Sequence, residues 1–539
     1  MATFGNEHIL DLKHFLKLVY SDEKIKISDK CVQRLDKTRY FIQHLLDNNI
    51  KVYGLTTGFA DLRDCAVAPH LAAELSINII SSHDAGIGKP FPTDVVLGAM
   101  IIRANSLSKG NSGFQTSSLQ TLLDMINARV IPIIPETGSL GASGDLANLA
   151  RLGQAMQGND VPVEYNGEII SAKLALQRAG IKPFSPKAKE GLALTNGTAF
   201  MASMIAIGYQ RQINLLNNLF SVLGLFLNSI GAIDASFYSC LQLARKQTGQ
   251  TIVADLISRQ FKNSPFINHT GVQDDYCVRC LPQIFGPRIE IILEQKAKVN
   301  AELDAITDNP LLFLENEISA DVSNKRKISF QNEDWVVISG GNFHGEILST
   351  IADTICAANA KIALTLERHL TYMLNPFRNK NTLPTYLIHQ EEKKGLLSGY
   401  MIPQYTANSL AQKICMMAQP VSTYNITSAN ESEDLVSYGA TAAHKLLDQI
   451  DLMNQLLTIY LTTSMQAYSL SRRQILNKGK SIPSSLLSEI IFQSVQEQHS
   501  HAPFPSEENF AKKYEINSKI LESGSLYTTS GISLYNSLV

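Results

Sequence analysis

Long runs of apolar residues at helical spacing constrain the fold of this chain more than any other feature. Between His344 and Leu374, apolar side chains recur every three or four residues, which places them on one face of an α-helix. The same pattern covers four further stretches, residues 201–232, 287–306, 404–419 and 434–471. These stretches hold few Gly or Pro residues, so we predict a mainly α fold with a central bundle of long helices.

The first 200 residues carry a more mixed pattern. Pro and Gly residues between 132 and 144 predict a loop, and Asn166-Gly167 predicts a type I′ hairpin within residues 161–170. A second hairpin is expected over residues 311–339, with its polar residues near 323–327. The patterns predict three parts: a smaller mixed N-terminal region (1–200), the long-helix bundle (201–480), and a C-terminal helical segment and tail (481–539).

Composition excludes several classes of protein. The 47 Lys and Arg residues and 49 Asp and Glu residues give a net charge of −2, so no basic field points to nucleic acid or a membrane surface. The longest apolar stretch, residues 219–233, contains Asn228 and Ser229 and is too short to span a bilayer. No signal peptide is recognised, and seven cysteines, an odd number, favour a reducing compartment. We therefore expect a cytoplasmic protein.

Other polar clusters fit ordinary structure. Cys277 and Cys280 have CxxC spacing, but no second pair completes a zinc site, so we expect no metal. Residues 302–310 are typical of a helix end followed by a turn. The acidic residues Glu431, Glu433 and Asp434 are interpreted as favourable charge at a helix N-terminus.

The tripeptide Ala142-Ser143-Gly144 can form an electrophile from backbone alone. The Gly144 nitrogen can attack the Ala142 carbonyl and close a five-membered ring, and loss of water, including the Ser143 hydroxyl, leaves an exocyclic methylene. The product is 4-methylideneimidazol-5-one (MIO). Small residues are needed because they leave the nitrogen and the carbonyl unhindered. The tripeptide alone is weak evidence, since roughly one chain in five of this size contains it by chance.

Several segments together resemble the ammonia-lyases that use this group, which act on histidine, phenylalanine or tyrosine, and their aminomutase relatives; histidine ammonia-lyases are the most similar in appearance. The matching segments are residues 53–59, 82–88, 138–147, 194–198, 273–283, 339–345 and 399–404. The resemblance runs from about residue 40 to 475 in the family's order and spacing. It implies the ammonia-lyase or fumarase-aspartase-like architecture, no external cofactor, and a homotetramer whose active sites are each shared by three subunits.

The resemblance also implies the reaction, an elimination of ammonia from a small-molecule amino acid. Tyr53 is similar to the base that removes the β-proton, although a tyrosine has a pKa near 10 and needs either a lowered pKa or a transient proton acceptor. Arg279 is expected to hold the substrate carboxylate through its bidentate fork. Asn196 is expected to stabilise negative charge on the carboxylate or on the prosthetic carbonyl.

Further residues take roles from the same resemblance. Tyr276 is similar to a family tyrosine near the amine and the methylidene group, and Phe343 to an aromatic residue near that ring. Gln273 and Gln404 are expected to be supporting hydrogen-bond partners.

The substrate depends on two residues that point in different directions. Ser82-His83 resembles the pair found in histidine lyases, and His83 can hydrogen-bond an imidazole. Lys413 stands where many family members carry Glu, and a cation facing an imidazole is unfavourable. The leading hypothesis is conversion of histidine to urocanate. The alternatives are a phenylalanine or tyrosine ammonia-lyase, a 2,3-aminomutase with the same site, and a non-catalytic helical scaffold.

Overall fold

The computed structural model of the protein describes residues 1–5, 9–499, 504–506 and 509–534. These residues form two compact units, each discontinuous in sequence. Unit 1 comprises Met1–Ile207, Lys296–Ala352 and Val421–His444, and unit 2 comprises Gly208–Gln295, Asp353–Pro420 and Lys445–Val539. Residues 500–503, 507–508 and 535–539 of the expected C-terminal segment lie outside the described residues.

Four long helices have residues in both units: α9 (Ala199–Ser229), α13 (Leu281–Leu303), α14 (Glu346–Leu374) and α16 (Gly439–Asn477). They confirm the predicted helices and the mainly α fold class, with boundaries that differ by a few residues. By length and composition alone, α14 is apolar enough to cross a membrane. However, 61% of its apolar window is buried inside the protein, as in the core helix of a folded domain.

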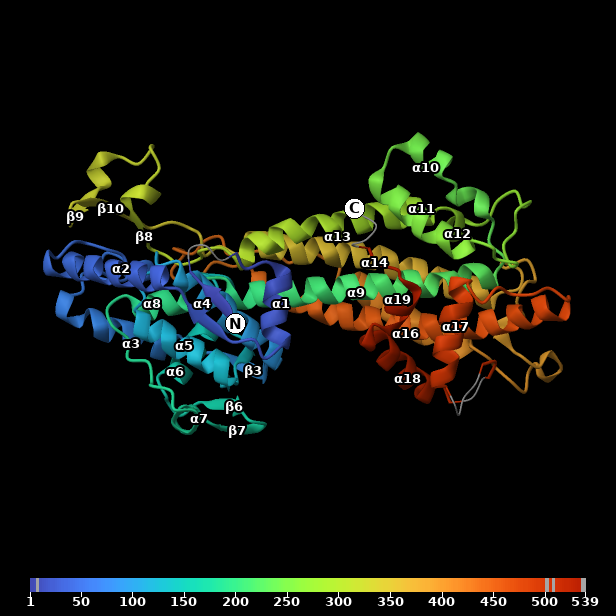
Figure 1. Cartoon of the computed structure of the whole chain (residues 1–539), viewed down its shortest axis with the longest axis horizontal. Coiled ribbons are helices and arrows are strands. Elements are labelled where there is room, and N and C mark those ends of the chain that lie inside the picture. Colours follow the sequence, from blue (N-terminus) through green and yellow to red (C-terminus); the bar gives the residue numbers. More distant parts are fainter. Residues whose placement is uncertain (6–8, 500–503, 507–508, 535–539) are drawn as a thin grey trace. The chain divides into compact units, whose positions relative to one another are not determined.

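Eight α-helices among the described residues belong only to unit 1 (Figure 1). They are α1 (Leu12–Tyr20), α2 (Asp29–Asp47), α3 (Ala72–His83), α4 (Thr93–Ser108), α5 (Thr116–Ala128), α6 (Leu146–Met156), α7 (Ala172–Ala179) and α8 (Glu190–Thr195).

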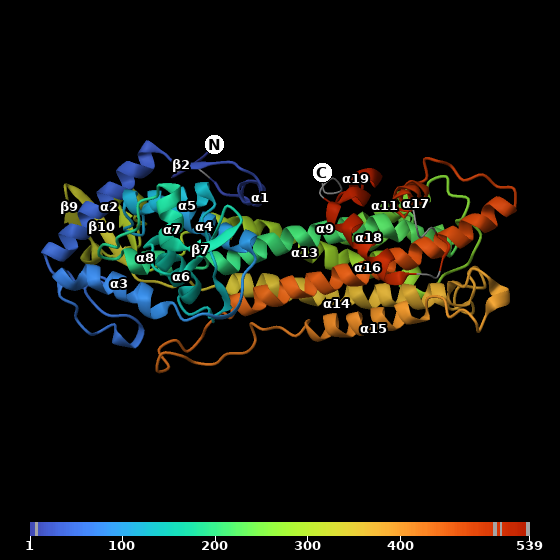
Figure 2. The same ribbon diagram turned by 90° about the horizontal axis from the view of Figure 1, so that it is seen from below.

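The helices that belong only to unit 2 are α10 (Ser239–Arg245), α11 (Thr248–Phe261), α12 (Tyr276–Arg279), α15 (Met401–Met416), α17 (Leu487–Gln498), α18 (Phe510–Ser523) and α19 (Ser525–Ser530). Figure 2 shows α15 running alongside α14, and Gln404 Nε2 of α15 donates to Thr371 Oγ1 of α14 over 3.0 Å.

A buried ladder of three side-chain amides joins the long helices within unit 2. Asn359 of α14 exchanges two hydrogen bonds of 2.8 and 2.9 Å with Gln212 of α9, and its Nδ2 also donates to Gln449 Oε1 of α16 over 3.1 Å. The Gln449 amide in turn donates to the carbonyls of Cys356 and Ile414. All three amide side chains are fully buried, and their mutual bonds offset the cost of removing them from water.

The strands are short and form small sheets. They are β1 (Ala2–Phe4), β2 (Ile25–Ile27), β3 (Ile87–Pro90), β4 (Ile131–Pro132), β5 (Pro135–Thr137), β6 (Pro162–Tyr165), β7 (Glu168–Ser171), β8 (Leu311–Leu314), β9 (Ile328–Phe330) and β10 (Glu333–Ile338). Strands β6 and β7 form the predicted hairpin, and the positive φ angles of Asn166 (51°) and Gly167 (79°) fit its type I′ turn.

The second predicted hairpin is wrong in detail. The segment forms a three-stranded antiparallel sheet in the order β8-β10-β9. Its tight turn is Gln331-Asn332, where both residues have positive φ, and residues 324–326 form a short 3₁₀ helix instead. Strand β10 is central because its Trp335 is fully buried and stacks on Phe41 of α2 at 4.4 Å between ring centroids.

This aromatic contact also fixes the loop that carries Tyr53. Val52 and Leu55 flank that tyrosine, and both belong to the buried cluster that contains Phe41 and Trp335. Figure 1 shows α2 beside the strands of this sheet. Packing therefore anchors the backbone on both sides of Tyr53.

Asp145 joins two helices through its buried carboxylate. It stands directly before α6, yet it does not cap that helix with its side chain. Instead, its Oδ2 accepts from the backbone N–H groups of Phe200 (2.8 Å) and Met201 (3.1 Å) in the first turn of α9. Burial raises the pKa of Asp145 to about 7, against the lowering effect of these N–H donors and of Ser139.

We expect Asp145→Ala to lower the free energy of unfolding by about 1 to 3 kcal/mol, because it leaves two buried N–H groups without their acceptor. The measurement is urea denaturation followed by circular dichroism. The matched control is Asp11→Ala, which removes an exposed cap at His14 N of α1 and should cost about 1 kcal/mol or less. Equal losses in the two variants would contradict the role assigned to Asp145.

Candidate active site

Unit 1 contains a cavity of about 350 Å³ that is lined by several of the predicted residues. Tyr53, Ala142, Ser143 and Phe343 all line it. The remaining lining residues are Ala60, Arg63, Gly141, Asn309, Ser339, Gly340, Gly341, His344, Ser432, Glu433, Asp434, Leu435 and Val436. The fold therefore brings the tyrosine, the tripeptide and the aromatic residue together from distant parts of the sequence.

The tripeptide lies in a tight turn in which the third position, Gly144, has room only for glycine. Ser143 and Gly144 have φ angles of 51° and 83°, and the Gly144 N–H donates to the Gly141 carbonyl over 3.3 Å. A Cβ on Gly144 would stand 2.1 Å from the Gly197 oxygen, so only glycine fits there. The turn is held by Gly197 N, which donates to the Ser143 carbonyl over 3.0 Å. Ala142 and Ser143 of this tight turn line the cavity.

Tyr53 lines the cavity, and its hydroxyl group already takes part in a hydrogen bond. The hydroxyl oxygen accepts from the Ala60 backbone N–H over 3.0 Å. Burial raises the pKa of Tyr53, the nearby Glu433 carboxylate raises it further, and the Ala60 N–H and Arg63 lower it. Of the two conditions named for a tyrosine base, a lowered pKa is not the one found here, so a base role for Tyr53 requires a proton acceptor or a high pH.

Asn196 is buried behind the turn, at the C-terminal end of α8. Its Nδ2 donates to the Asn309 carbonyl over 2.8 Å, and within the described residues its Oδ1 has no hydrogen-bond partner. Asn309 itself lines the cavity, and its Oδ1 accepts from the Gly340 N–H over 2.7 Å. Asn196 does not itself line the cavity, and its unpartnered Oδ1 can accept a hydrogen bond from a donor that reaches it.

His83 is the last residue of α3 and is half-buried. Its Nδ1 lies 3.0 Å from Ser82 Oγ. Burial lowers the pKa of His83, and the Glu433 carboxylate raises it. His83 is not among the residues that line the cavity, although it shares the Glu433 field with Tyr53.

The other five predicted residues belong to unit 2 and do not line this cavity. Tyr276 is 70% exposed, and the Arg279 guanidinium lies over its ring at 4.6 Å from the centroid. The Arg279 Nε is buried and has no hydrogen-bond partner among the described residues. Gln273 is exposed and accepts from Lys380 Nζ through its backbone carbonyl (3.4 Å). The two residues on α15 are Gln404, which contacts α14 as described above, and Lys413, which is exposed.

The acidic cluster was misplaced by the sequence interpretation. Helix α16 begins at Gly439, so Glu433 and Asp434 lie in the preceding loop and line the cavity. Ser428 Oγ donates to Glu433 Oε2 over 2.8 Å, which braces the loop internally. The available signal was its length, since about 20 residues without a helix or strand between α15 and α16 are typical of a functional loop.

In the part of the chain that the structure describes, side chains form neither a metal-binding cluster nor a disulfide. No group of three or more His, Cys, Asp or Glu side chains is arranged to hold a metal ion there. Cys277 and Cys280 are both free thiols, and burial raises the pKa of Cys277 to about 11. A raised thiol pKa disfavours the reactive thiolate.

Comparison with known proteins identifies the family. The family model for aromatic amino acid lyases matches residues 10–493. Histidine ammonia-lyase from Treponema denticola is 35% identical over 458 residues, which cover 85% of this chain and 86% of that relative. The crystal structure of histidine ammonia-lyase from Trypanosoma cruzi superimposes with a TM-score of 0.84 at 27% identity, over 98% of this chain and 95% of that one. Phenylalanine aminomutase from Pantoea agglomerans shares the fold, with a TM-score of 0.86 at 23% identity over 98% and 100% of the two chains. The chain therefore belongs to the aromatic amino acid lyase family and is an ammonia-lyase.

Proposed function

We propose that this enzyme eliminates ammonia from L-histidine to give urocanate, with an MIO group formed from Ala142-Ser143-Gly144. The observation that carries the proposal is the shared cavity of the tripeptide and Tyr53. The substrate follows from relatives that are named histidine ammonia-lyases and cover most of this chain.

The cyclised tripeptide would supply an electrophilic carbon that turns the amine into a leaving group. Tyr53 removes the β-proton, for which its phenol must first lose a proton. The Glu433 carboxylate raises the pKa of that phenol, so the ionised form of Tyr53 becomes more abundant as the pH rises. Asn196 holds an oxygen of the substrate or of the cyclised tripeptide with the amide hydrogen that Asn309 does not use.

Histidine suits the neutral state of His83. Burial lowers its pKa, so at neutral pH the ring has one donor and one acceptor nitrogen and can hydrogen-bond an imidazole. Lys413 is exposed on α15, where its charge is solvated and need not face the substrate ring. The state of His83 favours histidine over a substrate with an apolar ring, and the exposure of Lys413 removes an objection to histidine.

We further propose a cytoplasmic homotetramer with shared active sites. The exposed ring of Tyr276 and the buried, unpartnered Nε of Arg279 are the features expected of groups that another subunit completes. In such an assembly Arg279 holds the substrate carboxylate, with Tyr276, Gln273 and Gln404 around it, and Phe343 packs against the cyclised tripeptide.

The function is tested by incubating the enzyme with histidine, phenylalanine and tyrosine separately. We expect the ultraviolet absorbance of urocanate to rise with histidine, and the intact protein to be lighter than its sequence by two waters. Ser143→Ala, which cannot lose the serine hydroxyl, is the matched control and should show neither. Turnover of phenylalanine or tyrosine in place of histidine, or a β-amino acid product, would contradict the proposal.

We expect Tyr53→Phe to lower kcat by about 100- to 10,000-fold, the usual contribution of a general base, while the mass deficit stays the same. Steady-state kinetics and mass spectrometry of one sample give both values. Tyr40→Phe removes the hydroxyl of a tyrosine that is 63% exposed on α2 and should keep normal turnover. Near-normal turnover of Tyr53→Phe would exclude Tyr53 as the base.

In the pH–rate profile, the part in which activity rises with pH should move to lower pH in Glu433→Gln. Activity rises with pH as the Tyr53 phenol ionises, and the Glu433 carboxylate raises the pKa of that phenol. Removing the negative charge therefore lowers this pKa. The measurement is kcat/KM against pH, with Glu431→Gln, an exposed neighbour in the same loop, as the control. An unchanged position of this part, or a shift to higher pH, would show that Glu433 does not act on Tyr53.

A further inference from the structure

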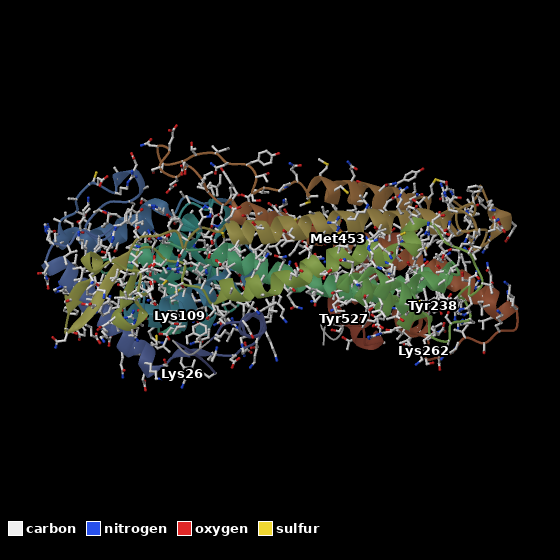
Figure 3. All side chains as sticks on the ribbon, turned by 90° about the horizontal axis from the view of Figure 1, so that it is seen from above. Lys26, Lys109, Tyr238, Lys262, Met453 and Tyr527 are labelled. Atoms are coloured by element: carbon white, nitrogen blue, oxygen red, sulfur yellow. The ribbon has the colours of Figure 1, made fainter. Side chains whose placement is uncertain are left out.

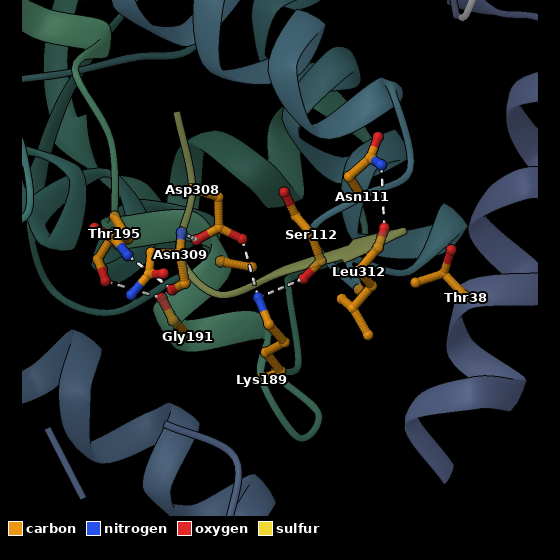
Figure 4. Close-up of polar contacts among 12 residues, drawn as sticks. Thr38, Asn111, Ser112, Lys189, Gly191, Thr195, Asp308, Asn309 and Leu312 are labelled. Carbon is orange, nitrogen blue, oxygen red and sulfur yellow. Dashed lines mark hydrogen bonds and ion pairs between the residues drawn. The ribbon is translucent and has the colours of Figure 1, made fainter. Parts of the chain in front are cut away.

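A fully buried ion pair lies in unit 1 and has no part in the chemistry above (Figure 4). Lys189 Nζ stands 3.0 Å from Asp308 Oδ2, and both side chains are 0% exposed. The same Nζ donates to the Ser112 carbonyl over 2.8 Å. Burial lowers the pKa of Lys189, while the Asp308 carboxylate raises it.

A second buried cation lies close to this pair. Arg103 is 0% exposed, and its Nη2 donates to the Ala193 carbonyl. Its Nε and Nη1 have no hydrogen-bond partner among the described residues. Burial lowers the pKa of Arg103 to about 10, against the opposing effect of Asp308. Buried ion pairs are rarely more stabilising than apolar packing of the same volume, so stability alone does not explain the presence of these charges.

Asp308 connects the ion pair to the cavity through a short chain of hydrogen bonds. Its Oδ1 accepts from the Asn309 N–H over 2.7 Å. The Asn309 carbonyl accepts from Asn196 Nδ2, and its side chain accepts from the Gly340 N–H. One residue, Asn309, thus links a buried charge to the Asn196 amide through its backbone N–H and carbonyl, and to the turn that precedes Phe343 through its side chain.

We propose that Lys189 and Asp308 form a positioning pair, which fixes the backbone of Asn309 so that the Asn196 amide faces the reacting groups. This inference rests on the role given to Asn196 under the proposed function. Lys189 holds one carboxylate oxygen of Asp308, which aims the other oxygen at the Asn309 N–H. Without Lys189, the Asp308 carboxylate rotates or takes up a proton, and the Asn309 carbonyl loses its fixed direction toward Asn196.

The test is a double-mutant cycle of Lys189→Met with Asn196→Ala. We expect Lys189→Met to lower kcat by up to about 100-fold, the cost of a small displacement of a group that acts in the transition state, with little change in KM. In the Asn196→Ala background the same substitution should change kcat by less than about twofold, because the two residues act through one another. Equal reductions in both backgrounds would overturn the proposal.

Asp308→Asn keeps the volume and an acceptor for the Asn309 N–H while removing the charge, so it serves if Lys189→Met does not fold. It should lower kcat when Asn196 is present and leave kcat unchanged in the Asn196→Ala background. The control is Lys109→Met, which breaks the partly buried Lys109–Asp304 pair (2.8 Å) elsewhere in unit 1 (Figure 3). That control should lower the melting temperature but not kcat.

A crystal structure of Lys189→Met separates failure of this proposal from failure of the proposed function. We expect the distance from Asn196 Nδ2 to the Asn309 carbonyl to exceed about 3.5 Å, which is beyond a hydrogen bond. An unchanged distance of 2.8 Å would overturn the positioning pair whatever the substrate is. Absence of turnover in the wild type with a longer distance in the variant would reject only the proposed function.

Discussion

The close contact of two glycine backbones, Gly144 and Gly197, sets the geometry on which the site depends. A Cβ on Gly144 would strike the Gly197 oxygen, and a Cβ on Gly197 would stand 2.6 Å from Arg103 Nη1. The tripeptide turn, the residue that follows the end of α8 and the buried Arg103 side chain are therefore in close contact. Asp145 follows the same turn and holds the start of α9. A shift in any one of these layers has to move the others.

The long helices could be predicted from sequence because their apolar periodicity persists over many turns. Helices α14 and α16 begin two and five residues later than their predicted starts at 344 and 434, since local signals locate helix ends poorly. The hairpin at Asn166-Gly167 was equally readable, because that dipeptide favours positive φ at both positions. The turn at Gln331-Asn332 was not, because the more polar residues at 323–327 are the better local turn signal. The structure instead packs Trp335 of the central strand on Phe41, a contact between distant residues that no local turn signal reveals.

The residues of the site also fall into two groups, those that adjacent residues or motif order could predict and those that only long-range contacts reveal. The chemistry of Ala142-Ser143-Gly144 follows from three adjacent residues, and motif order adds Tyr53 and Phe343. Glu433 was missed because a local rule about charge at helix ends explained it well enough. Its approach to Tyr53 arises only when a loop 380 residues further along the chain folds over the cavity. Asn309 looked like part of a turn for the same reason, although it bonds to both Asn196 and Gly340. The roles of the unit 2 residues, such as Arg279, stay predictions.

The amide ladder of Gln212, Asn359 and Gln449 fixes the axial alignment of α9, α14 and α16 within unit 2. If one helix slid past its neighbours by one turn, about 5.4 Å, these donors and acceptors would face apolar side chains with no water to replace their partners. A purely apolar seam would tolerate small slips, whereas the ladder admits only discrete alignments. Residues far apart on α9, α14 and α16 are thereby held at set axial spacings, and a change in bundle packing would occur as a step rather than as a gradual drift.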